Sequence, residues 1–90
     1  MAAYLISYDL HKKGEAGYEN LIEAIKSHAK WCHHLESDWV VISSGSAEAI
    51  RDELLPHIHK DDKLIVFKLS GEAAWYGLSD TISNWLKKNL

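Results

Sequence analysis

The sequence of 90 residues is poor in three residue types, because Cys32, Pro56 and Arg51 are the only cysteine, proline and arginine. A lone cysteine cannot form a disulfide within the chain, and residues 1–7 lack the basic region and long apolar run of a signal peptide. We therefore expect a cytoplasmic protein. No apolar run approaches the roughly 20 residues that cross a bilayer, so we expect no membrane span.

Charge and size narrow the class of protein further. The net charge of −3 argues against a strongly basic face for nucleic acid, although a local lysine cluster remains compatible with it. A chain of 90 residues predicts a single domain over residues 1–90. A domain of this size buries only about 60% of its unfolded surface, so we also expect a homodimer that shares apolar surface.

Hydrophobic periodicity predicts seven elements in the order β-α-β-β-α-β-α. Alternation and β-branched or aromatic residues indicate strands, and apolar residues at helical spacing indicate helices. The expected strands are residues 3–10, 31–35, 39–43 and 63–69, and the expected helices are residues 18–29, a segment capped by Ser46, and a segment from about Ser79. The first six elements match a ferredoxin-like βαββαβ sandwich in the α+β class, with an additional C-terminal helix.

Asp9 is the polar residue that stands out most, because it ends an otherwise apolar first strand. Two copies of Asp9 in a two-fold dimer could hold Mg²⁺ through oxygen ligands and activate a water against a phosphodiester. The alternative is that Asp9 caps the following loop by accepting backbone N–H bonds. Lys12 and Lys13 follow in that loop and could contact phosphates, or they could simply be solvated lysines.

Histidine is abundant, and a metal site such as one for Zn²⁺ or Ni²⁺ is an alternative use of it. The six are His11, His28, His33, His34, His57 and His59. His57 and His59 lie at an expected helix end and are followed by Asp61 and Asp62, so these four residues are the candidate metal site. His33 and His34 are strand neighbours and point to opposite faces. Surface or hydrogen-bonded histidines are the competing interpretation. Cys32, beside a tryptophan on a strand, is typical of a buried, inert thiol.

Trp75 and Tyr76 lie in the segment that follows the last strand, where we expect a loop. The other tryptophans are explained by core or dimer contacts, but a loop pair of aromatic residues is suited to meeting a partner. The sequence shows no glycine-rich phosphate loop and no Ser/His/Asp arrangement.

The order of elements, with YLISYDL ending in Tyr8-Asp9, KWCHHLES, a short helix and KLIVFKL, resembles the CRISPR-associated Cas-two-like family over residues 1–69. The stand-alone relatives of that family and the virulence-associated D-type ribonucleases are similar. The resemblance implies a ferredoxin-like homodimer in which Asp9 is the catalytic, Mg²⁺-binding residue of an endonuclease or endoribonuclease acting on RNA or DNA. Some members of the family act instead as a DNA-binding scaffold.

The sequence departs from the family pattern after Asp9, where His11, Lys12 and Lys13 stand in place of arginines, and at the C-terminus, where a helix replaces an exchanged strand. Two hypotheses follow. In the first, the chain is a metal-dependent nuclease in which Asp9 holds Mg²⁺ and Lys12 and Lys13 contact the substrate backbone. In the second, the same fold is a non-catalytic module that binds nucleic acid or protein through Trp75, Tyr76 and the face of the sheet.

Overall fold

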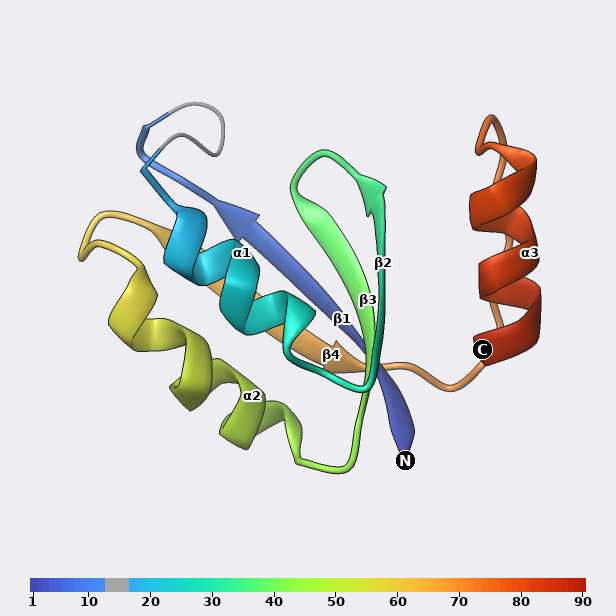
Figure 1. Cartoon of the computed structure of the whole chain (residues 1–90), viewed down its shortest axis with the longest axis horizontal. Coiled ribbons are helices and arrows are strands. Elements are labelled where there is room, and N and C mark those ends of the chain that lie inside the picture. Colours follow the sequence, from blue (N-terminus) through green and yellow to red (C-terminus); the bar gives the residue numbers. More distant parts are fainter. Residues whose placement is uncertain (13–16) are drawn as a thin grey trace.

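The computed structural model describes residues 1–12 and 17–90 of the chain (Figure 1). Its elements are β1 (Ala2–Asp9), α1 (Glu19–Lys26), β2 (Lys30–Leu35), β3 (Asp38–Ser43), α2 (Ala47–Leu54), the short 3₁₀ helix η1 (Leu55–His57), β4 (Lys63–Lys68) and α3 (Asp80–Asn89). The predicted α+β class and the predicted order of the strands and α-helices are confirmed.

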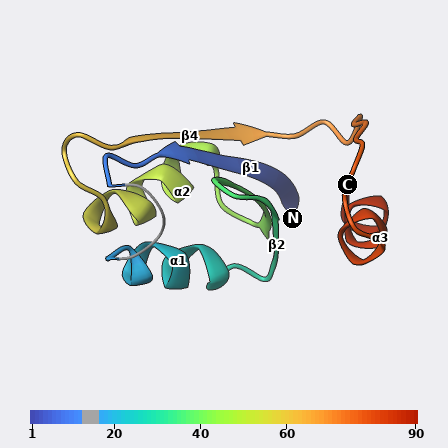
Figure 2. The same cartoon turned by 90° about the horizontal axis from the view of Figure 1, so that it is seen from above.

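The four strands form one antiparallel sheet in the order β2-β3-β1-β4. The central strand β1 pairs with β3 on one side and with β4 on the other, so that Ile6 lies opposite Trp39 and Val66. Figure 2 shows α1 and α2 together on one side of the sheet, while α3 lies apart from them, beyond β2. The face that α1 and α2 cover is called the core face here.

Local sequence explains where the helices begin and end. Ser46 is extended and its Oγ accepts from the N–H of Ala49 at 3.0 Å, an N-cap that starts α2. Ser79 caps α3 in the same way through the N–H of Ile82 at 3.2 Å. The α-helix α2 stops before Pro56, which lacks the N–H that a longer α-helix would need and lies instead in η1.

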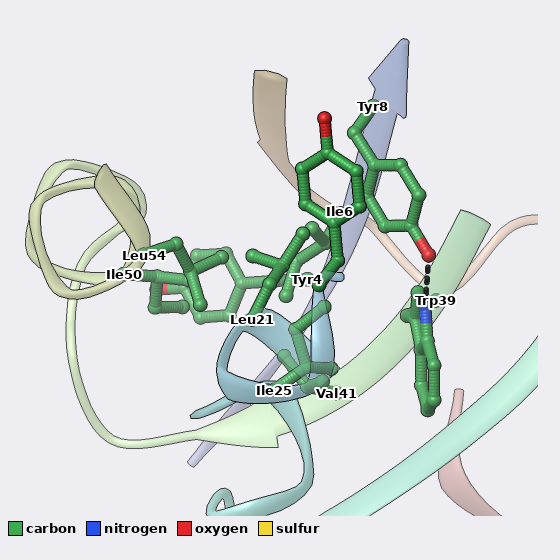
Figure 3. Close-up of a cluster of buried hydrophobic side chains, with 10 residues drawn as sticks. Tyr4, Ile6, Tyr8, Leu21, Ile25, Trp39, Val41, Ile50 and Leu54 are labelled. Atoms are coloured by element: carbon green, nitrogen blue, oxygen red, sulfur yellow. Dashed lines mark hydrogen bonds between the residues drawn. The ribbon is translucent and has the colours of Figure 1, made fainter. Parts of the chain in front are cut away.

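The core fills the space between the core face and the two helices. Every second residue of β1 enters it, and the fully buried set comprises Ile6, Tyr18, Leu21, Ile25, Trp39, Val41, Ile50 and Leu54. Figure 3 shows this cluster, in which the Trp39 Nε1–H donates to the Tyr8 hydroxyl at 3.0 Å. Burying each large apolar side chain contributes about 1.5 to 3 kcal/mol, so this cluster supplies most of the driving force for folding.

The opposite face of the sheet is covered only in part. Leu5 and Val40 are cross-strand partners on that face, and Val40, Cys32 and the α3 residue Leu86 are buried although they lie outside the main core. Over β4 the same face is open, because Ile65 and Phe67 keep 47% and 52% of their surface exposed. We call this surface the open half of the second face.

Among residues 1–12 and 17–90, no helix has both the length and the apolar character needed to cross a membrane.

Candidate functional site

The structure places Asp9 at the end of β1, exposed and opposite Lys63, the first residue of β4. Asp9 has no hydrogen-bond or ion-pair partner within the described part of the chain. The alternative that it caps the following loop therefore finds no support among those residues. Lys12, the third residue after the strand end, is also exposed, and Lys13 lies outside the described residues.

A compact polar cluster that the sequence did not predict forms beside Asp9, around the carboxylate of Asp62. Asp62 Oδ1 accepts from the backbone N–H of His11 at 2.7 Å and from the Tyr18 hydroxyl at 3.1 Å. Asp62 Oδ2 accepts from the backbone N–H of His59 at 2.8 Å. His11 Nδ1 also lies 2.7 Å from Oδ1. We call His11, Tyr18, His59 and Asp62 the Asp62 cluster.

The aromatic rings of the cluster are packed edge to face. The ring of His59 lies 4.9 Å from that of His11 and 5.5 Å from that of Tyr18, with interplanar angles of 80° and 87°. The Asp62 side chain is fully buried under these groups, whereas 32% of the His11 side chain stays exposed. The cluster therefore ties the end of β1 to the turn before β4 and to the start of α1.

Hydrogen bonding decides the protonation state of Asp62. Burial alone would raise the pKa of Asp62, but the backbone N–H groups of His11 and His59 and the side chains of His11 and Tyr18 outweigh it and hold that pKa well below its usual range. An ionised carboxylate only accepts, so His11 donates to it through Nδ1–H. Burial, followed by the hydrogen bond to Asp62 and its charge, raises the pKa of Tyr18.

This end of the sheet thus combines an exposed carboxylate, an oriented imidazole and flanking lysines. Such groups can bind a cation, contact a phosphate and position a proton donor. The sequence groups Asp61 and Asp62 with His57 and His59 as a candidate metal site, but it gives no sign of the bonds that Asp62 makes with His11 and Tyr18. The available signal was the spacing of His59 and Asp62, since an Asp side chain in a turn commonly bonds a nearby backbone N–H.

Trp75 and Tyr76, the predicted partner-binding pair, lie in the C-terminal part of the chain and are not brought together with Asp9. Tyr76 is 99% exposed, as expected for a contact residue. Trp75 is half-buried, and its Nε1–H donates to Ser83 Oγ at 3.0 Å, which fixes the loop to α3.

Two further histidines, His28 and His33, contact other residues of the fold. The ring of His33 stacks on Trp39 with centroids 3.8 Å apart, and His28 Nε2 lies 3.1 Å from Glu53 Oε1, linking the end of α1 to α2. In residues 1–12 and 17–90, no three His, Cys, Asp or Glu side chains gather closely enough to hold a metal ion. Cys32 is buried, and burial raises the pKa of its thiol, as expected for an unreactive cysteine.

Neither a scan against models of known protein families nor a comparison with curated proteins finds a match to this chain. Its function therefore has to be inferred from its own residues and contacts.

Proposed function

We propose that this chain is a homodimeric, Cas-two-like endonuclease that cleaves phosphodiester bonds, RNA in the first instance, with Mg²⁺ bound at Asp9. The observation that carries the proposal is the exposed carboxylate of Asp9, which ends the central strand of the sheet without a partner in the described part of the chain. A free carboxylate in such a place is available to a metal or a substrate.

The connectivity of the chain supports a ferredoxin-like fold for this protein. The order β1-α1-β2-β3-α2-β4 has two crossover helices, and the strand order β4-β1-β3-β2 puts β1 and β3 at the centre of an antiparallel sheet. We propose a ferredoxin-like sandwich in which α3 is the additional C-terminal helix.

The open half of the second face supports a homodimer. Ile65 and Phe67 expose about half of their surface there, and such apolar residues favour a self-complementary two-fold contact. Side chains alternate along β1, so Asp9 shares this face with Leu5 and Ser7. A dimer built on this face would bring the two copies of Asp9 toward the same side of the interface.

The donor chemistry of Asp9 fits Mg²⁺, which takes oxygen ligands from one or two carboxylates and keeps the other positions for water and substrate phosphate. When bound, Mg²⁺ supplies a polarised phosphoryl oxygen and an activated water. The chain contributes the positioning. Lys12 and Lys63 provide positive charge beside Asp9 for the substrate backbone, and the Asp62 cluster holds His11 in a fixed orientation near the strand end.

The test is cleavage of labelled single-stranded RNA and double-stranded DNA by purified dimer, with Mg²⁺, Mn²⁺ or EDTA. Asp9→Asn should abolish cleavage, and Asp61→Asn, which alters a neighbouring exposed carboxylate, should leave it intact. Activity that persists in Asp9→Asn or in EDTA would contradict the proposal.

A second function, a non-catalytic binding module with the same fold, is favoured by the full exposure of Tyr76 and by the presence of a single arginine. Under this function no substrate is cleaved in any lane. In a pull-down, the wild-type protein would instead retain a protein or nucleic acid that the Tyr76→Ala variant does not retain.

A further inference from the structure

A groove of about 320 Å³ lies between α3 and the start of β2, the outermost strand of the sheet. We call it the α3 groove. One wall is Lys30 of β2, and the other is a stripe of α3 whose residues have the spacing i, i+3, i+4, i+7 and i+8. The residues of this stripe are Thr81, Asn84, Trp85, Lys88 and Asn89.

The α3 groove is open to solvent. Every lining side chain except Trp85 and Asn89 is exposed, and these two are partly exposed, so a ligand can reach the groove without any rearrangement of the core. The Asn89 Nδ2–H donates to the Trp85 carbonyl at 2.8 Å, and Asn89 Oδ1 accepts from Lys30 Nζ at 3.4 Å. These two bonds hold the β2 wall against the α3 wall.

The charge of the groove is opposite in sign to that of the whole protein. Lys30 and Lys88 both line it, and no Asp or Glu among the described residues does, whereas the chain has a net charge of −3. The C-terminal dipole of α3 accounts for Lys88 alone, because Lys30 lies on the facing strand. Two lysines brought together from distant parts of the sequence favour an anionic ligand.

Aromatic surface accompanies this positive charge on both sides of the β2 edge. Trp85 lies in the groove, and Trp31, the neighbour of Lys30 along β2, points to the other face of the sheet and is 40% exposed. Lys26 Nζ lies 5.1 Å from the centre of the Trp31 ring. A flexible chain that passes over the β2 edge thus meets lysine and tryptophan twice. Single-stranded nucleic acid carries the matching groups, which are phosphates and planar bases.

The α3 groove lies far from Asp9. Lys30 pairs with Ile42, and Ile42 pairs with Ala3, so the groove is level with the beginning of β1, whereas Asp9 is the last residue of that strand. At about 3.3 Å per residue, the separation along the strand is about 20 Å. A ligand in the groove is therefore held independently of the proposed nuclease centre.

We propose that the α3 groove binds single-stranded nucleic acid, with phosphates on Lys30 and Lys88 and a base stacked on Trp85. A single strand is specified because the bases of a duplex are stacked on one another and cannot reach a tryptophan side chain in this way. The amide of Asn84 can donate and accept, so it can bond the edge of any base, and no sequence preference is expected. This proposal does not depend on the nuclease proposal and applies equally to a non-catalytic module.

The experiment measures the fluorescence anisotropy of a labelled oligouridine of about ten nucleotides, and of the matching RNA duplex, in EDTA so that no metal-dependent cleavage occurs. Lys30→Ala and Lys88→Ala should each reduce the slope of log affinity against log salt by about 0.7, the value for one phosphate contact on a single strand. Lys87→Ala is the matched control, because it removes the same charge from the neighbouring exposed residue of α3, outside the groove. It should leave the slope unchanged. Trp85→Leu should weaken binding by roughly 5- to 150-fold, as expected for the loss of one stacked base.

Four results would overturn the proposal. The first is no binding of oligouridine by wild type at low salt, and the second is binding of the duplex as tight as that of the single strand. The third is an equal loss in Lys87→Ala and Lys88→Ala, which would show diffuse attraction to the helix and no defined groove. The fourth is full affinity in Lys88→Ala with a loss in Lys12→Ala, which would place the nucleic acid at the Asp9 end. The lysine variants decide the matter even if Trp85→Leu fails to fold.

Discussion

Replacing Asp62 by asparagine should destabilise the fold, because Asp62 ties the end of β1 to the turn before β4 and to the start of α1. The carboxylate is fully buried and accepts three hydrogen bonds, two from backbone N–H groups of His11 and His59 and one from the Tyr18 hydroxyl, besides its contact with His11 Nδ1. Asparagine keeps one acceptor oxygen, so its NH₂ group must face one of these donors.

The magnitude follows from two effects. One buried donor left unsatisfied costs about 1 to 3 kcal/mol, and the bonds that remain lose their charge assistance, which about halves their strength. Together these predict a loss of about 2 to 4 kcal/mol in the free energy of unfolding. Small domains have only about 5 to 15 kcal/mol in total, so the melting temperature should fall by more than about 10 °C.

Urea denaturation followed by tryptophan fluorescence measures this directly. Asp61→Asn is the matched control, because Asp61 is exposed and adjacent, and it should change the free energy of unfolding by less than about 0.5 kcal/mol. If Asp62→Asn also stays within that range, the Asp62 cluster does not stabilise the fold and the reasoning is refuted.

The remaining predictions concern pH, the dimer contact and a helix cap. The pKa of Asp62 is lowered in the folded state, so the ionised Asp62 carboxylate contributes its full stabilisation above the unfolded aspartate pKa of about 3.9. This contribution declines as the pH falls below that value. Urea titrations over the acid range should therefore show a shrinking difference in the free energy of unfolding between wild type and Asp62→Asn. Phe67→Asp should convert the proposed dimer to monomer in light scattering, whereas Leu55→Asp, also at an exposed apolar residue but outside the sheet, should not. A dimer that survives Phe67→Asp would place the interface elsewhere. Ser46→Ala should cost about 1 kcal/mol in thermal denaturation because it removes the N-cap bond to Ala49, and no measurable loss would show that the cap contributes nothing.

The elements that could be predicted from sequence are those that local signals define. Alternation along β1, the serine caps at Ser46 and Ser79, and the polar turn between β2 and β3 each lie within a few residues of the structure they specify. The position of Asp9 at the end of β1 was predicted for the same reason.

The Asp62 cluster and the placement of α3 could not be predicted from local signals. Asp62 bonds residues that lie 51 and 44 positions away, His11 and Tyr18, so the contact exists only after β4 pairs with β1. The apolar stripe of α3 predicts that the helix docks, but periodicity does not say which face it covers.

The measurement that tests the central claim most directly is the stoichiometry of Mn²⁺ binding, by electron paramagnetic resonance, to wild type, Asp9→Asn and Asp61→Asn. Mn²⁺ serves as a probe of a site made for Mg²⁺, and a shared site predicts one ion per dimer in wild type and in Asp61→Asn, with none in Asp9→Asn. Binding that is unchanged in Asp9→Asn, or absent from wild type, would contradict a metal-dependent nuclease built on Asp9.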